Sequence, residues 1–244
     1  MKNGLKRGGV LLLLIAMVAA APMSTLAESL DRSPVAVETM TEEAAADMED
    51  VLGTLELEEE KPVYTDPLVA LLEAQELNPV SPQSADLDAY LDELLATLIT
   101  DDMTTYEQVK ACYDYLVDNM RYGSHTAGLG ATVGNTTARS IYSAYGEVEG
   151  FGAVALLTKQ GLCNAYSSAF VLMMRKIGLD ARLVSGSTKA RGGYYTVHKW
   201  AEINIDGTAY VFDTQLEQNL RSSGLPAYSV FYKTYGQVGN RYIR

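Results

Sequence analysis

The chain of 244 residues contains only two cysteines, Cys112 and Cys163, and only two histidines, His125 and His198. None of these four residues stands at the close spacing that pairs of zinc ligands share. No glycine-rich loop of the phosphate-binding kind precedes a predicted helix. The sequence therefore predicts no metal site, and we expect no cofactor.

Long apolar runs are equally scarce. The one candidate, VLLLLIAMVAAA, follows three basic residues and is about a dozen residues long, which is too short to span a bilayer. Thr25 and Ala27 place small residues where a signal peptidase needs them. We interpret residues 1–27 as a secretory signal peptide, with an uncleaved signal anchor as the alternative. The mature protein is then expected to be secreted, free or associated with the cell envelope, with no integral membrane segment.

Basic side chains are nearly absent from the front of the chain. Residues 28–100 contain nineteen acidic and two basic side chains, whereas residues 101–244 contain twelve and fourteen. With a net charge of −12 over the whole chain, nucleic acid is disfavoured as a partner, because phosphate binding needs clustered Lys and Arg. Residues 28–83 are predicted to be an acidic linker or a pro-segment that covers the active site until it is removed. A short helix is expected at DPLVALLEAQEL within it.

Regular structure is predicted from Ser84 onward. Leucines in SADLDAYLDELLATLIT recur at helical spacing and form one apolar stripe. Thr104 and Glu107 have the spacing of a capping box, which predicts a second helix over TTYEQVKACYDYLVDNM. Cys112 falls on the apolar face of that helix, so we expect it to be a buried free thiol. A disulfide with Cys163 remains the alternative for an exported protein.

The middle of the chain is rich in Gly, Ser and Thr. Residues 122–150 are predicted to form a long loop, a cleft wall or lid, with His125 as an ordinary surface residue. A short helix is expected at GAVALLTK. Another helix is predicted to begin at Cys163 and to end at Gly178, which stands at the usual stop position.

The last third of the chain reads as antiparallel strands. We expect them at ARLVSGST, YYTVHKWAEINI, TAYVFDTQ and YSVFYKTYGQV. Asp206-Gly207, between the second and third, is a strong signal for a two-residue hairpin turn. Helices followed by strands predict an α+β fold for a domain over residues 84–244.

The hairpin predicts a specific approach of two side chains. A two-residue turn at Asp206-Gly207 places His198 opposite Gln215 and Asp213 opposite Trp200. His198 and Asp213 are then diagonal neighbours on one face of the sheet. An imidazole beside a carboxylate can hold and deliver a proton, although a structural sheet histidine and a surface carboxylate remain the alternatives.

Cys163 is the candidate nucleophile. At the first residue of a helix, unpaired backbone N–H groups and the helix dipole stabilise a thiolate. His198 would hold the proton, and Asp213 would orient His198. The backbone N–H of Cys163 would contribute to an oxyanion hole, with Gln160 as a weak candidate for the second donor.

The segments GLCNAYSSAFVLMMRKIGLDARLVSG and HKWAEINIDGTAYVFDT resemble the transglutaminase-like cysteine enzymes of bacteria. Their pattern is G-x-C-x-x-Y at a helix start, V-S-G at a strand end, H-x-W in the next strand and Asp after the strand that follows. The resemblance covers roughly residues 101–216. It implies a papain-like α+β core with Cys163, His198 and Asp213 as the catalytic triad. The family often has Trp soon after this Asp and Ala after this His, where the chain has DTQLEQ and Lys199.

These observations predict a secreted cysteine acyl-transfer enzyme that acts on protein or peptide amides, as a hydrolase. A transglutaminase that joins Gln to Lys is one alternative. A non-catalytic binding or cell-envelope module on the same fold is another, because fold membership alone does not fix activity. The sequence sets no oligomeric state.

Overall fold

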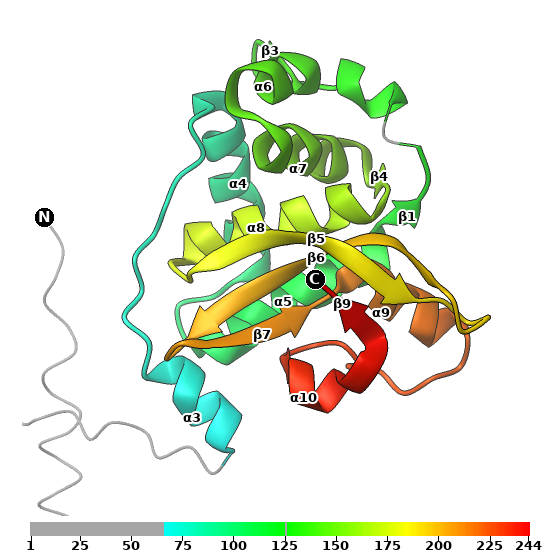
Figure 1. Cartoon of the computed structure of the whole chain (residues 1–244). Coiled ribbons are helices and arrows are strands. Elements are labelled where there is room, and N and C mark those ends of the chain that lie inside the picture. Colours follow the sequence, from blue (N-terminus) through cyan, green and yellow to red (C-terminus); the bar gives the residue numbers. More distant parts are fainter. Residues whose placement is uncertain (1–65, 125) are drawn as a thin grey trace, which may run out of the picture. The chain divides into compact units, whose positions relative to one another are not determined.

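The computed structural model describes residues 66–124 and 126–244. The predicted signal peptide, most of the acidic segment and His125 lie outside the described residues. All of the described residues belong to one compact unit, Lys61–Arg244. This unit consists of helices packed on an antiparallel sheet, as predicted (Figure 1).

The main sheet has five strands in the order β8-β7-β6-β5-β9, and every neighbouring pair is antiparallel. The central strands are β5 (Ala181–Lys189), β6 (Tyr195–Ile205) and β7 (Thr208–Phe212). Short strands complete the two edges: β8 (Lys233–Thr234) beside β7 and β9 (Tyr242–Ile243) beside β5. The last part of the chain therefore returns to the sheet next to β5.

The predicted turn at Asp206-Gly207 is present. Ile205 pairs with Thr208, and both turn residues have positive φ, at 49° and 75°. These dihedrals fit the type of two-residue turn that matches the twist of the flanking strands. The register predicted from the sequence is therefore correct as far as Phe212, which pairs with Ala201.

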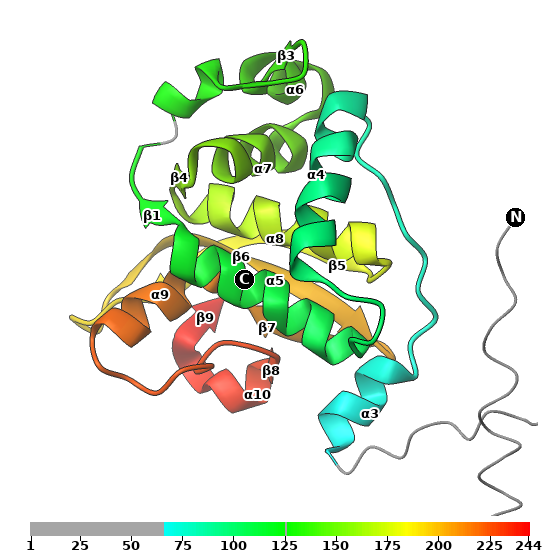
Figure 2. The same cartoon turned by 180° about the vertical axis from the view of Figure 1, so that it is seen from behind.

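Helices cover the sheet in stacked layers. The helix α8 (Cys163–Ile177) packs on β5 and β6, with α7 (Glu147–Thr158) and α6 (Ala138–Tyr145) stacked beyond it. From behind, α5 (Thr105–Asn119) and α4 (Ala85–Leu98) lie in front (Figure 2). Within residues 66–124 and 126–244, no helix is long and apolar enough to cross a membrane.

Local sequence explains where these helices begin and end. Ser84 caps α4 by accepting from the N–H of Leu87, and Thr104 and Glu107 form the predicted capping box of α5. Gly178 ends α8 with a φ of 113°, a left-handed conformation that favours glycine. The short helix α3 (Pro67–Glu73) lies within DPLVALLEAQEL and buries Leu72 completely.

The prediction of one long loop over residues 122–150 was wrong. This stretch contains β1 (Arg121–Tyr122), the 3-10 helix η1 (Ala127–Gly130), β2 (Thr132–Val133), β3 (Thr136–Thr137), α6 and the first turn of α7. Thr137 caps α6 by accepting from the N–H of Ser140. The buried residues of α6 are Ala138 and Ile141 alone. Such a short apolar pattern is hidden by the polar composition around it.

Two predicted strands were too long. The third hairpin strand ends at Phe212, because Asp213 caps a helix, α9 (Thr214–Ser222), by accepting from the N–H of Leu216. Within YSVFYKTYGQV only β8 is extended, and Thr234 caps the short helix α10 (Tyr235–Val238) that follows it. The 3-10 helix η2 (Gly239–Arg241) then leads into β9. In both places a side-chain cap starts a helix where strand-like residues continue.

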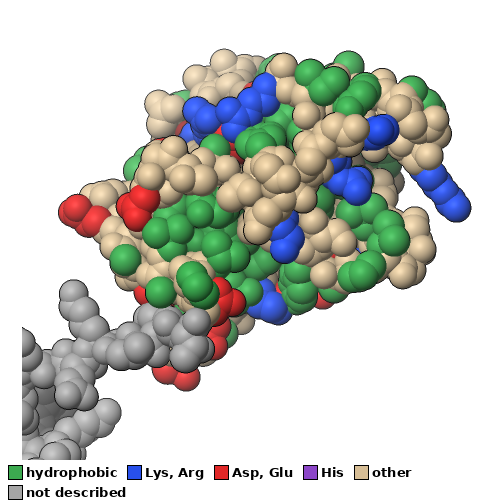
Figure 3. All heavy atoms as spheres, turned by 60° about the horizontal axis from the view of Figure 1, so that its bottom comes forward, with side chains coloured by type: hydrophobic (Ala, Val, Ile, Leu, Met, Phe, Trp, Pro, Cys, Tyr) green, Lys and Arg blue, Asp and Glu red, His purple; other side chains and the backbone are tan. Residues whose placement is uncertain are grey.

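One face of the unit segregates its charge. Figure 3 brings forward the lower face of the Figure 1 view and shows hydrophobic side chains gathered near its middle. Most visible Asp and Glu side chains lie to the left, and most Lys and Arg side chains lie above and to the right.

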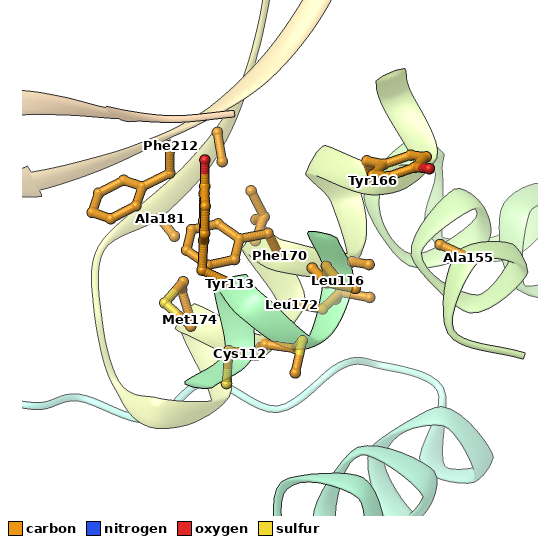
Figure 4. Packing of buried hydrophobic residues seen from close by; sticks show 14 of the residues in the cluster. Cys112, Tyr113, Leu116, Ala155, Tyr166, Phe170, Leu172, Met174, Ala181 and Phe212 are labelled. Atoms are coloured by element: carbon orange, nitrogen blue, oxygen red, sulfur yellow. The ribbon is translucent and has the colours of Figure 1, made fainter. Parts of the chain in front are cut away.

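Aromatic side chains join α5, α8 and the sheet. Phe170 of α8 stacks on Phe212 of β7, with ring centroids 5.3 Å apart. Tyr113 of α5 meets both rings edge-on, at 5.7 and 6.5 Å (Figure 4). Ser167 Oγ also donates to the carbonyl of Lys199 at 3.0 Å. These contacts fix the helix that begins at Cys163 against the strand that carries His198.

Candidate active site

A cleft of about 730 Å³ contains both Cys163 and His198 in its lining. Its walls come from the start of α8, the outer ends of β5 and β6, one side of α9 and the segment 238–241. Lining residues on these different elements approach one another only in the folded chain.

Cys163 is the first residue of α8, as predicted. The preceding residue, Leu162, provides no side-chain cap, so the N–H groups of the first turn are not all satisfied by a side chain. Gly161 permits this tight entry, because a Cβ there would lie 2.3 Å from the Cβ of Ala165. The sulfur is thus held at the positive end of a helix, where a thiolate is stabilised.

The electrostatics of Cys163 favour the thiolate. Burial raises the pKa of the thiol. The hydrogen bond to His198, the charge of His198 and the backbone N–H of Lys199 together lower the pKa by more than burial raises it, so the net pKa lies below its ordinary value. The Cys163 thiol therefore loses its proton more readily than a free cysteine.

His198 lies on β6 opposite Gly186 and is only 4% exposed. Its Nε2 is 2.6 Å from Asp213 Oδ2, which leaves Nδ1 for the hydrogen bond to Cys163. Burial lowers the pKa of His198, but Asp213 and then Cys163 raise it, to a net value of about 10. The imidazole therefore remains protonated while the neighbouring thiol ionises.

Asp213 is completely buried and is held on all sides. Its Oδ1 accepts from the N–H of Leu216 at 3.0 Å, and its own N–H donates to the carbonyl of Val230 at 3.1 Å. Its Oδ2 accepts from Tyr242 Oη at 2.9 Å, in addition to facing His198. The carboxylate is thus anchored by α9, by the segment before β8 and by β9.

The structure brings together all three residues that the sequence analysis singled out. His198 and Asp213 meet as the hairpin geometry suggested, but Asp213 does so from a helix cap and not from a strand. Gln160 does not line the cleft, and its amide Nε2 donates to the carbonyl of Ser124 at 3.5 Å. Trp200 is fully buried and lies nearly parallel to His198, with centroids 6.3 Å apart.

Sequence reasoning missed two tyrosines at the site. Tyr242 comes from β9, which pairs with β5 at Thr188. Tyr122 lines the cleft, and its strand β1 runs parallel to β4 (Gln160–Gly161), so that Tyr122 pairs with Gly161. Burial, and then the charge of Cys163, raises the pKa of Tyr122. No local pattern marks either residue, because each reaches the site through a pairing distant in sequence.

Cys112 is not joined to Cys163 in the structure, where both thiols are free. Cys112 is completely buried in the core among side chains of α5 and α8 (Figure 4). Burial raises its pKa to about 12. The interpretation of Cys112 as a small buried hydrophobe agrees with this environment.

Among the described residues, no group of three or more His, Cys, Asp and Glu side chains is arranged to hold a metal ion. Cys163 and His198, which line the cleft, form a relay of thiol, imidazole and carboxylate with the buried Asp213. Such a relay supports nucleophilic attack and proton transfer with the side chains alone.

Residues 92–213 match the family model of the transglutaminase-like superfamily. The chain therefore belongs to the transglutaminase-like superfamily, and its helices and antiparallel sheet form a papain-like α+β fold. The match includes all three residues of the relay. No curated protein matches the chain in sequence.

Two solved structures resemble parts of this chain. One is a candidate cysteine protease from Cytophaga hutchinsonii, with 19% identity and a TM-score of 0.36 over 61% of this chain and 42% of that one. The other is a TGase, with 12% identity and a TM-score of 0.33 over 70% of this chain and 37% of that one. The chain thus matches less than half the length of either protein.

Proposed function

We propose that the protein is a cysteine acyl-transfer enzyme that hydrolyses amide bonds in proteins or peptides. The observation that carries the proposal is the relay itself. A thiol of lowered pKa at a helix start is hydrogen-bonded to an imidazole, which is held 2.6 Å from a buried carboxylate in an open cleft.

The proposed reaction has two halves. The Cys163 thiolate attacks the amide carbonyl carbon, and a C–S bond forms while the carbonyl oxygen becomes negative. The backbone N–H of Cys163 stabilises that oxygen. His198 donates its proton to the nitrogen as the C–N bond breaks, and the amine leaves. Water, deprotonated by His198, then attacks the thioester and releases a carboxylic acid and the free thiol.

Asp213 and Tyr242 act through His198. The Asp213 carboxylate stabilises the imidazolium and fixes its ring orientation, as the third member of a triad does. Tyr242 donates to the same carboxylate oxygen and holds it in place. Tyr242 is therefore proposed as a positioning residue.

The test is peptide hydrolysis in water enriched in ¹⁸O, with a proteome-derived peptide library as substrate and mass spectrometry as readout. The unmutated protein should release new carboxyl termini that carry ¹⁸O. Cys163→Ala should release none, and Cys112→Ala, the matched control for the second thiol, should retain activity. Equal cleavage by the Cys163→Ala variant would contradict the proposal.

The group that accepts the acyl chain distinguishes a crosslinking enzyme from a hydrolase, because the first uses an amine and the second uses water. Transfer of a labelled primary amine to glutamine side chains, in place of ¹⁸O incorporation, would identify a transglutaminase. Binding of a partner that Cys163→Ala retains, with neither reaction detected, would identify a non-catalytic module.

We also propose that the protein is exported and acts outside the cytoplasm. The support is the basic and apolar start of the chain, followed by small residues up to Ala27. The mass of protein recovered from culture medium or the cell envelope should correspond to a chain that begins at Glu28. Recovery of the whole chain from the cytoplasm alone would contradict export.

A further inference from the structure

The cleft has an unbalanced charge. Among residues 66–124 and 126–244, the ionisable side chains that line it, apart from Cys163 and His198, are Tyr122, Lys189, Arg191 and Arg241, and no Asp or Glu of these ranges does so. This contrasts with residues 101–244 as a whole, which contain twelve acidic and fourteen basic side chains. The site described above therefore lies beside three cationic side chains in a part of the chain whose charges nearly balance.

The three cationic groups are not neutralised within the part of the chain that the structure describes. Neither Lys189, Arg191 nor Arg241 forms an ion pair there. By contrast, Lys199, next to His198, pairs with Glu147, and Arg221 of α9 pairs with Asp114. The three cations of the cleft thus remain available to a ligand.

The positions of the three cationic residues in the sheet determine their distance from the relay. Lys189 ends β5, three residues beyond Gly186, which is the partner of His198, and Arg191 follows in the turn to β6. Arg241 lies beside the same stretch, since its carbonyl accepts from Thr188 Oγ1 at 3.4 Å. At about 3.3 Å per residue of strand, Lys189 lies roughly 10 Å along β5 from the level of His198. That span equals about three residues of an extended peptide.

The rest of the cleft suits a polypeptide. Val197 is 83% exposed, Tyr122 57% and Leu225 50%, and all three line the cleft. Exposed apolar surface of this kind accepts side chains, and the amides of Gln215, Asn219 and Asn240 provide polar contacts. Three cations without a continuous basic stripe fall short of the phosphate-tracking surface typical of nucleic-acid proteins.

We propose that the cleft selects polypeptide segments with Asp or Glu two to four residues from the bond at Cys163. Lys189, Arg191 and Arg241 bind these carboxylates and are the specificity-determining residues. The position of the reacting bond rests on the proposed function, whereas the preference for an acidic segment does not.

The test measures binding without turnover. Two fluorescein-labelled peptides are identical except for Glu or Gln at the positions two to four residues on each side of a central Ala-Gly bond. Fluorescence anisotropy records their affinity for the full-length Cys163→Ala protein. Because three partly exposed charge pairs would form, the Glu peptide should bind about tenfold more tightly at low ionic strength. The difference should shrink as salt rises to about 0.3 M, because salt screens exposed charges.

Two variants assign the effect to the cleft. The triple change K189Q/R191Q/R241Q, made in the same protein, should abolish the preference for Glu. Arg139→Gln, which neutralises an exposed arginine of α6 outside the cleft, should leave it intact. Circular dichroism of the triple variant verifies its fold, and the salt dependence of the unmutated cleft is a readout that needs no variant.

Three results would overturn the proposal: equal affinity for the two peptides, a preference for Glu that survives in the triple variant, or more effective displacement by an oligonucleotide of matched charge. A separate assay distinguishes failure of the proposed acyl-transfer function from failure of the proposed preference for acidic segments. If Cys163 of the unmutated protein does not react with iodoacetamide while the Glu preference is present, the acyl-transfer proposal fails and the substrate preference stands.

Discussion

Tyr242 Oη donates a hydrogen bond to Asp213 Oδ2 at 2.9 Å, the same oxygen that His198 Nε2 approaches at 2.6 Å. One carboxylate oxygen thus connects the imidazole to a strand at the far edge of the sheet. A close approach of β9 to β5 makes this possible, since a Cβ on Gly186 would lie 2.2 Å from the carbonyl oxygen of Ile243.

Tyr242→Phe should lower kcat about tenfold, with KM little changed. A hydrogen bond to a charged carboxylate contributes about 1.5 kcal/mol, which corresponds to about tenfold in rate, and its loss frees Asp213 to move relative to His198 while the buried ring is retained. Steady-state kinetics with a cleaved peptide measure the effect. Tyr195→Phe, which removes a hydroxyl bonded to the Asn240 carbonyl, is the control and should leave kcat unchanged. Equal losses in both variants would show that Tyr242 has only a structural role.

The reactivity of Cys163 should have a pH profile set by two groups. Thiolate appears as pH rises through the lowered pKa of Cys163, and the ion pair is lost as His198 deprotonates near pH 10. Iodoacetamide labelling, located by mass spectrometry, should therefore begin at a lower pH than for a free thiol, whose pKa is about 8.5. Asp213→Asn lowers the pKa of His198 and so should move the onset to higher pH. An onset that is identical in the two proteins would contradict this coupling.

Cys112 should resist labelling in the folded protein at every pH below about 10. Its thiol is completely buried, and its pKa is raised to about 12. Denaturant without reductant should make it react fully. A Cys112 that becomes reactive only after reduction would reveal the disulfide that the structure does not contain.

Glu217 should be a major determinant of stability. It is fully buried, and its carboxylate accepts from the N–H of Val230 at 3.0 Å and pairs with Arg221 at 3.1 Å. Removing the carboxylate leaves the buried N–H of Val230 and the hydroxyl of Tyr113 without this acceptor and takes one carboxylate away from Arg221, so Glu217→Ala should reduce the free energy of unfolding by about 3–5 kcal/mol.

Urea unfolding measures this loss, with Asp118→Asn as the control. Asp118 also faces Arg221, at 3.5 Å, but is 65% exposed, so its loss should cost less than about 1 kcal/mol. A similar small cost for Glu217→Ala would mean that the buried network contributes little to stability.

Local signals predicted much of the fold. The helix starts at Ser84, Thr104 and Cys163 and the turn at Asp206-Gly207 depend on residues within a few positions of one another. Local signals gave a wrong prediction where the same residues fit two local structures. Asp213 continues an alternating strand pattern, yet its side chain caps the N-terminus of α9 and ends the strand one residue earlier.

The site was predictable only in part for a related reason. One tight hairpin places His198 near Asp213, so the turn determines their approach. Tyr122 and Tyr242 arrive through the pairings β1 with β4 and β5 with β9. Strands of two residues have no periodicity to recognise, and their partners are set by the packing of the whole unit. The charge of the cleft likewise depends on which of the scattered basic residues the fold gathers.

The order of the site residues along the chain also determines when the relay can assemble during synthesis. Translation produces Cys163 first, then His198 and Asp213, and Tyr242 only at β9. Contacts between distant segments form late in folding, after the cost of closing the intervening loops. A nascent chain therefore exposes an ordinary thiol, and the set of Cys163, His198, Asp213 and Tyr242 is complete only when β9 docks on β5.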